Sequence, residues 1–193
     1  MRIAFPALLT ICCAGLAGAQ TDDVPAYPQV RLETTEGPIV LQLDGRRAPL
    51  TVRNFLALVE EGHYDGTVFH RVIGDFMIQG GGYTRNYEER EPADTIPNES
   101  GNGLRNLRST VAMARTGNPH SAAAQFYINV ADNTALDPRP DRWGYTVFGN
   151  VIEGMDVVDR IAAAPTGPGG PFQQDVPVMP VVIEKASRVS PGG

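Results

Sequence analysis

The stretch VFHRVIGDFMIQGGG, residues 68–82, predicts two short β-strands that are joined by a tight turn at Gly74-Asp75. The glycine run at its end lets another segment approach the backbone closely. If the second strand folds back on the first, Gln79 lies near Arg71, which places a cation and an amide beside apolar side chains. Such a polar pair suits a peptide ligand. Taken alone, the stretch is equally compatible with an ordinary hairpin whose Arg71 is solvated.

Side chains alternate between the two faces of a strand, and this assigns each residue of the predicted hairpin to a face. The first strand then has Arg71 on a mixed face, together with Phe69 and Ile73. The second strand has Met77 on the same face as Gln79, unless a bulge re-aims one of its side chains.

Further short strands are expected on both sides of the hairpin, where alternating or continuous apolar residues lie between turn signals. They are expected at 30–34, 39–43, 111–114, 125–130, 145–149 and 181–184. Three other segments are expected to be loops: 136–140, a Gly/Pro-rich stretch from Pro165 to Pro177, and the polar segment 83–106. A loop as long as 83–106 is usually functional, for example as a lid over a site.

Two amphipathic helices are also expected. The first begins at Pro49, ends at Gly62 and has an apolar stripe at helical spacing, formed by Val52, Phe55, Leu56 and Val59. The second begins at Met155 and turns Val157, Val158 and Ile161 inward. About eight strands without strand–helix alternation indicate a mainly β fold, and two helices suffice to cap its ends. We therefore expect a closed eight-stranded antiparallel β-barrel capped by two α-helices.

The first 19 residues have the features of a secretory signal peptide, with Arg2, an apolar run from Ile3 to Leu16, and small residues up to Ala19. The expected organisation is a signal peptide at 1–19, a flexible lead at 20–28, one domain at 29–189 and a tail at 190–193. Both cysteines fall inside the signal peptide, so the mature chain has no disulfide. We expect an exported protein, which is periplasmic, or secreted if the cell has no outer membrane.

Composition and motif spacing argue against several classes of function. The formal net charge of −6 argues against a nucleic-acid partner, and no run of like charges or long apolar run predicts membrane insertion. His63, His70 and His120 lack ligand spacing, so no metal is expected. No G-x-S-x-G motif is present, and the glycines at 80–82 lack the lysine of a phosphate-binding loop. The candidates that remain for a functional site are arginine, glutamine and apolar side chains, and no cofactor is expected.

Several ordered blocks of the chain resemble the signature of the cyclophilins, a family of peptidyl-prolyl cis-trans isomerases. The blocks are FHRVI at 69–73, FMIQGG at 76–81, VAMA at 111–114, QFYI at 125–128 and VFGNVIEGM at 147–155. The resemblance covers about residues 30–184 and is greatest to the bacterial periplasmic members. It implies the same capped barrel, a monomer and a cofactor-free isomerase that acts on proline-containing segments of unfolded or newly exported proteins.

The resemblance also implies the residues of the site. The three catalytic positions are Arg71, Phe76 and Gln79. The substrate-binding positions are Met77, Ala114, Gln125, Tyr127, Leu136 and Tyr145. In this interpretation the apolar members hold the proline ring, the glutamines hold the substrate backbone, and Arg71 donates to the prolyl nitrogen as the amide twists.

Four positions differ from many members of the family. Ala135 replaces a tryptophan, which should make binding of cyclosporin-type inhibitors weak, with Trp143 as a partial substitute. Tyr127 replaces a phenylalanine and brings a hydroxyl that needs a partner if it is buried. Tyr145 stands where many members have histidine, and Arg115 replaces an asparagine.

Two other functions stay open at this point. A proline-peptide-binding chaperone, a holdase with little turnover, is favoured by Ala135 and Tyr127. A structural barrel in an envelope assembly has only the unassigned loop 83–106 in its favour.

Overall fold

The computed structural model describes residues 24–90, 92 and 94–189. The expected signal peptide at 1–19 and the tail at 190–193 lie outside the described residues, as does the first part of the lead, 20–23.

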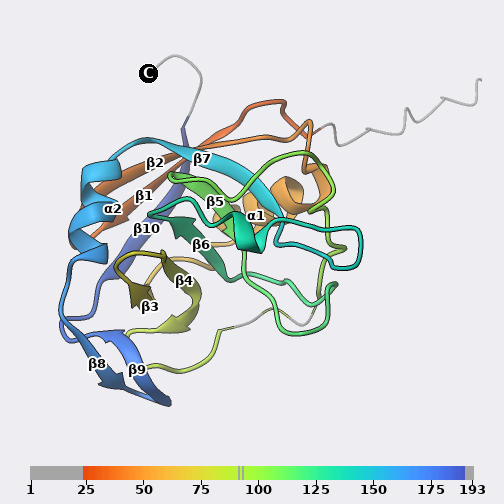
Figure 1. The fold of residues 1–193 in the computed structure, drawn as a ribbon. Coiled ribbons are helices and arrows are strands. Elements are labelled where there is room, and N and C mark those ends of the chain that lie inside the picture. The colour runs from red at the N-terminus through yellow and green to blue at the C-terminus, as the bar shows by residue number, and fades with distance from the viewer. Residues whose placement is uncertain (1–23, 91, 93, 190–193) are drawn as a thin grey trace, which may run out of the picture.

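Eight strands form a closed antiparallel barrel in the order β1-β10-β3-β4-β6-β5-β7-β2 (Figure 1). They are β1 (Gln29–Thr34), β2 (Gly37–Leu43), β3 (Thr67–Ile73), β4 (Met77–Thr84), β5 (Thr110–Met113), β6 (Phe126–Asn129), β7 (Val147–Glu153) and β10 (Val182–Val189). Because β1 also pairs with β2, the barrel has no open edge. This confirms the expected fold.

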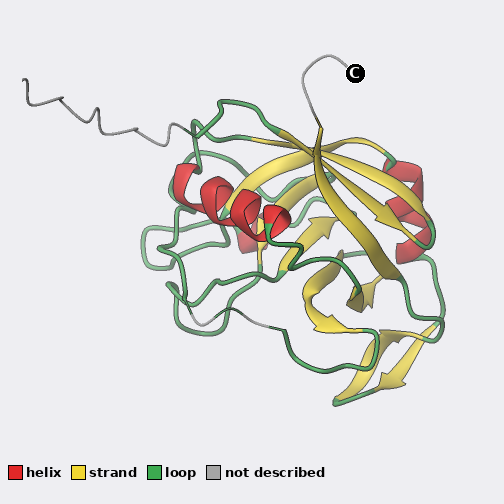
Figure 2. Cartoon of the chain, turned by 180° about the vertical axis from the view of Figure 1, so that it is seen from behind, coloured by secondary structure: helices red, strands yellow, loops and turns green. Residues whose placement is uncertain are grey.

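Two helices lie at opposite ends of the barrel (Figures 1 and 2). They are α1, Pro49–Glu60, and α2, Met155–Ala162. Each helix buries the apolar stripe that its sequence predicts. Within α1 the ring of Phe55 contacts the rings of Tyr64, Phe126 and Phe148, with centroid separations of 4.8 to 5.6 Å. These rings link the helix to β6 and β7. No helix in the described part of the chain is long and apolar enough to cross a membrane.

The first turn of α1 has no cap from its own side chains, and a residue of the long loop supplies one. The carboxylate of Glu99 accepts hydrogen bonds from the backbone nitrogens of Leu50, at 3.1 Å, and Thr51, at 2.8 Å. It also accepts one from the Thr51 hydroxyl at 2.7 Å. A negative charge at a helix N-terminus is favourable, and these backbone donors have no partner within the helix. The long loop is therefore tied to the end of the barrel.

The structure differs from the sequence prediction in three segments. The expected loop at 165–177 contains a hairpin of two strands, β8 (Thr166–Gly169) and β9 (Phe172–Pro177). The first residue of the loop expected at 136–140 belongs to a 3₁₀ helix, η1 (Thr134–Leu136). The strands expected from 125 and 145 begin at Phe126 and Val147. The predicted site residues Gln125 and Tyr145 therefore lie just before these strands.

Candidate active site

Arg71 and Gln79 are direct cross-strand partners on β3 and β4. Nε2 of Gln79 donates a hydrogen bond of 2.8 Å to Oε1 of Gln125, which precedes β6. The folding back that the sequence predicts for this stretch is therefore present, and it brings the cation and two amides together.

The predicted faces of the first strand are wrong for Phe69. Phe69 pairs with Gly80, but Arg71 pairs with Gln79, so His70 is an extra residue on β3. Such a bulge reverses the alternation of side chains. Phe69 consequently packs in the barrel core, at 1% exposure, whereas Arg71 and Ile73 lie on the outer side of the barrel wall.

The glycines of β4 allow the close approach that the sequence predicts. Gly81 has a φ of +88°, and a Cβ there would lie 2.9 Å from the ring of Tyr64. A Cβ at Gly82 would lie 2.3 Å from the side chain of Gln125. The absence of a side chain at Gly82 thus gives Gln125 the space from which it reaches Gln79.

A small pocket of about 120 Å³ opens on this outer side and is here called the apolar pocket. It is lined by Arg71, Phe76, Met77, Gln79, Ala114, Arg115, Tyr127, Leu136 and Tyr145. Its floor is a cluster that is separate from the barrel core, with Met77, Tyr127 and Val147 buried in it. Pockets for drug-sized ligands have volumes of about 300–1,000 Å³, so this one fits a single small ring or side chain. Eight of the nine predicted site residues line it.

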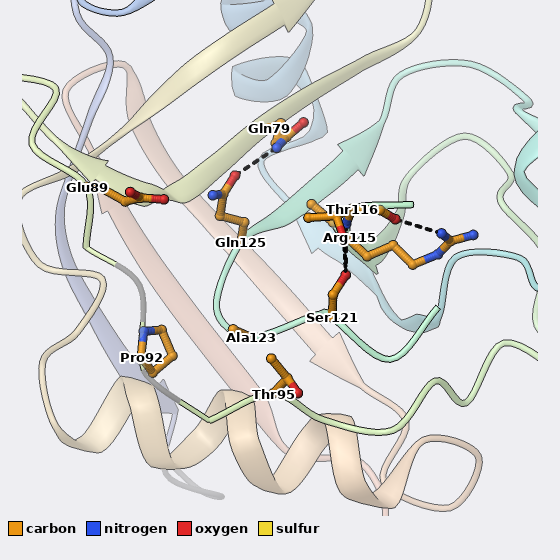
Figure 3. Close-up of a pocket in the computed structure, with 10 residues that line it drawn as sticks. Gln79, Glu89, Pro92, Thr95, Arg115, Thr116, Ser121, Ala123 and Gln125 are labelled. Carbon is orange, nitrogen blue, oxygen red and sulfur yellow. Dashed lines mark hydrogen bonds between the residues drawn. The ribbon is translucent and has the colours of Figure 1, made fainter. Parts of the chain in front are cut away.

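The ninth, Gln125, lines a neighbouring hollow of about 320 Å³, here called the adjoining pocket (Figure 3). Gln79, Ala114 and Arg115 line both pockets. The other residues of the adjoining pocket were not predicted: Glu89, Pro92, Thr95, Thr116, Ser121 and Ala123. Three of them belong to the long loop, whose irregular backbone gives no periodic signal in the sequence.

Arg115 forms the boundary between the two pockets and was not predicted to be a site residue. Its guanidinium donates to the backbone carbonyls of Thr116 and Trp143, both at 2.9 Å, and Gly144, at 3.2 Å. Its Cζ lies 4.4 Å from the ring centroid of Tyr145, a cation–π contact. These contacts fix Tyr145 at the rim of the apolar pocket.

The extra hydroxyl of Tyr127 has the partner that its burial requires. It donates a hydrogen bond of 2.7 Å to Oδ1 of Asn106. The backbone and side-chain nitrogens of Asn106 donate in turn to Oδ1 of Asp137, at 2.7 and 3.1 Å. Burial raises the pKa of Tyr127 well above its usual value, so the phenol stays neutral. Tyr127 therefore presents its ring to the pocket.

Trp143 does not take the place of the missing tryptophan. Its side chain is half exposed and packs edge-on against His120, with ring centroids 5.2 Å apart, and it does not line the apolar pocket. Ala135 lies on η1 and is exposed. Neither residue lines the apolar pocket.

Two observations bear on charge near the site. Among the described residues, no group of three or more metal-ligating side chains is found. His70, beside Arg71, is buried, which lowers its pKa to about 4; the charge of Arg71 lowers it further, while contacts with Val68 and Gln125 raise it. The imidazole is neutral at neutral pH.

The fold is a closed antiparallel barrel, and its outer wall carries a pocket large enough for one ring beside Arg71 and the amides of Gln79 and Gln125. The model of the family described as cyclophilin type peptidyl-prolyl cis-trans isomerase/CLD matches residues 29–188. The chain belongs to this family, and its activity is peptidyl-prolyl cis-trans isomerisation.

Curated relatives and solved structures agree with this assignment. The chain is 58% identical over 160 residues to the peptidyl-prolyl cis-trans isomerase cyp18 of Streptomyces antibioticus, with 81% of this chain and 96% of the relative covered. It is 48% identical over 161 residues to isomerase B of Escherichia coli, with 82% and 98% covered. A cyclophilin structure from Cryptosporidium parvum superposes with a TM-score of 0.69 at 25% identity, covering 85% of this chain and 98% of that one.

Proposed function

We propose that the proline ring of a client segment occupies the apolar pocket and that the flanking backbone lies along Gln79, Gln125 and Ala114. The observation that carries this proposal is the position of Arg71, which pairs with Gln79 at the rim of a pocket sized for one ring. A related cyclophilin structure from Cryptosporidium parvum was determined in the presence of the dipeptide Ala-Pro, which supports a peptide ligand of this kind.

The mechanism follows from the electronic structure of the amide. Rotation about a peptide bond has a barrier of about 18–20 kcal/mol because resonance must be broken in the twisted state. The lone pair of the prolyl nitrogen is then localised and can accept a hydrogen bond. The guanidinium of Arg71, which has only donors, supplies that hydrogen bond. Because the planar forms offer no such acceptor, the interaction favours the twisted state selectively.

The remaining residues hold the substrate while one side of the bond rotates. Phe76, Met77, Tyr127 and Leu136 contact the ring through apolar surface, with Tyr145 at the rim. The backbone nitrogen of Ala114 donates to the carbonyl of Gln125 at 2.9 Å, which keeps these two segments in register. No covalent intermediate, metal or proton transfer enters this scheme.

We also propose that the clients are unfolded or newly exported proteins and that the protein works outside the cytoplasm. The support is the signal-peptide pattern of residues 1–19. Expression of the full chain, followed by fractionation and determination of the mature N-terminus, tests this. Cleavage after Ala19 supports export, and an intact Met1 in the soluble fraction contradicts it.

The role of Arg71 is tested by NMR exchange spectroscopy on a peptide with one X–Pro bond. Removal of one well-placed donor lowers turnover by about 10²–10³-fold in other enzymes, and we expect Arg71→Ala to lower kcat/KM by about a hundredfold or more. Arg160→Ala is the matched control, since Arg160 lies on α2 and pairs with Asp156. Equal activity of Arg71→Ala and the control would refute the mechanism.

A further inference from the structure

The β8–β9 hairpin lies beside β3 and β4 (Figure 1). It carries an acidic side chain that lies near the site. Oδ2 of Asp175, on β9, lies 3.9 Å from Nε of Arg71. We propose that Asp175 is a positioning residue, which holds the Arg71 guanidinium in the orientation that donates to the prolyl nitrogen. This inference rests on the role proposed for Arg71.

The backbone of β9 is shaped so that Asp175 reaches the site. Gly169 pairs with Phe172 and Gly167 pairs with Val176, so β9 has two extra residues between these pairs. Asp175 lies in this bulge with a φ of +65°, in the left-handed region. Bulges re-aim side chains, and aspartate is among the few residues besides glycine that enter this region readily. An irregular strand thus directs its carboxylate at a catalytic arginine.

The hairpin is anchored to the strand that carries Arg71. The ring of Phe172 stacks on His70, with centroids 5.4 Å apart and planes at 23°. It also contacts Tyr83 edge-on at 5.0 Å. Since His70 and Arg71 are consecutive, the hairpin touches the strand at both positions. Asp175 is therefore placed relative to Arg71 by packing as well as by charge.

Orientation, rather than stability, is what this contact supplies. Both side chains are partly exposed, at 43% for Arg71 and 24% for Asp175, and such ion pairs contribute little to folding. The carboxylate lies at the Nε edge, which leaves the terminal nitrogens of the guanidinium for the substrate. Without Asp175 the long side chain samples more rotamers, and the aligned fraction falls. Small errors in placement lower rates strongly.

The test compares Asp175→Asn with Asp156→Asn, an equivalent change in an ion pair on α2. Asparagine tolerates the left-handed backbone, so the hairpin keeps its shape. We expect Asp175→Asn to lower kcat about five- to tenfold, with KM within about twofold of wild type. We also expect the Nε–Hε NMR resonance of Arg71 to shift and broaden, which a remote structural effect does not produce. Asp156→Asn should change neither quantity.

A double-mutant cycle separates this inference from the role of Arg71 itself. If Asp175 acts through Arg71, Asp175→Asn has no further effect in an Arg71→Ala background. An equal loss in both backgrounds, or an Asp175→Asn enzyme within about twofold of wild type, overturns the positioning role while Arg71 stays essential. Full activity of Arg71→Ala would instead refute the proposed role of Arg71.

Discussion

Acid pH should destabilise the fold through one buried imidazole. His70 is only 2% exposed, and its Nδ1 has no hydrogen-bond partner among the described residues. Burial lowers its pKa from 6.5 to about 4. The unfolded chain therefore takes up a proton at higher pH than the folded protein does. Stability is unaffected by His70 above pH 6.5, falls as the pH drops towards 4, and levels off below that value.

The size of this effect follows from the two pKa values. One unit of pKa shift corresponds to about 1.4 kcal/mol, so the loss amounts to about 2 kcal/mol at pH 5 and about 3 kcal/mol at pH 4. This is a large fraction of the stability of a typical domain, about 5–15 kcal/mol.

Urea unfolding of wild type and His70→Phe, measured from pH 7 to pH 4, tests the prediction. Phenylalanine keeps a ring between Tyr83 and Phe172 but cannot bind a proton. Carboxylates affect both proteins alike, so the difference between the two curves isolates His70. The difference should change by about 3 kcal/mol across this range. Parallel curves, or a His70 ring that titrates near 6.5 by NMR in the folded protein, would refute the reasoning.

Two further predictions concern the capped helix and the rate. Glu99→Ala leaves two backbone donors and the buried Thr51 hydroxyl without their acceptor, so we expect the free energy of unfolding to fall by about 2–3 kcal/mol in a urea titration. A loss below about 0.5 kcal/mol would contradict the capping role. The isomerisation rate should be nearly constant from pH 6 to pH 8, because arginine stays charged, the pKa of Tyr127 is raised, and the pKa of His70 is lowered to about 4. A steep pH profile in a stopped-flow assay would indicate a titrating group that the scheme lacks.

The sequence predicted the barrel well because its strands and helices are governed by local patterns. The stripe of α1, the helical start at Pro49 and the turn before Phe76 all depend on residues close together in the chain. The resemblance to the family then identified nine site residues, and the structure places them around two adjoining pockets. Their catalytic roles remain predictions.

The features that were missed depend on contacts between distant segments. Strand β8 contains two glycines and a proline, which are typical of loops, and its hairpin is held by Phe172 against His70 on β3. Glu99 caps a helix that begins 50 residues before it. Arg115 is fixed by carbonyls of a loop some 28 residues away. None of these contacts has a periodic signal, so a pattern of local residues could not reveal them.

The bulge at His70 connects the chemistry of the site to the expected weakness at acid pH. With strict alternation, Arg71 would share the barrel interior with Phe69, where an unpaired charge costs several kcal/mol. One extra residue on β3 allows Phe69 to fill the core while Arg71 reaches the outer pocket. That extra residue is itself enclosed under Phe172, and the Nδ1 of its ring is buried without a hydrogen-bond partner among the described residues. The geometry that exposes Arg71 thus also buries the imidazole that should titrate near pH 4.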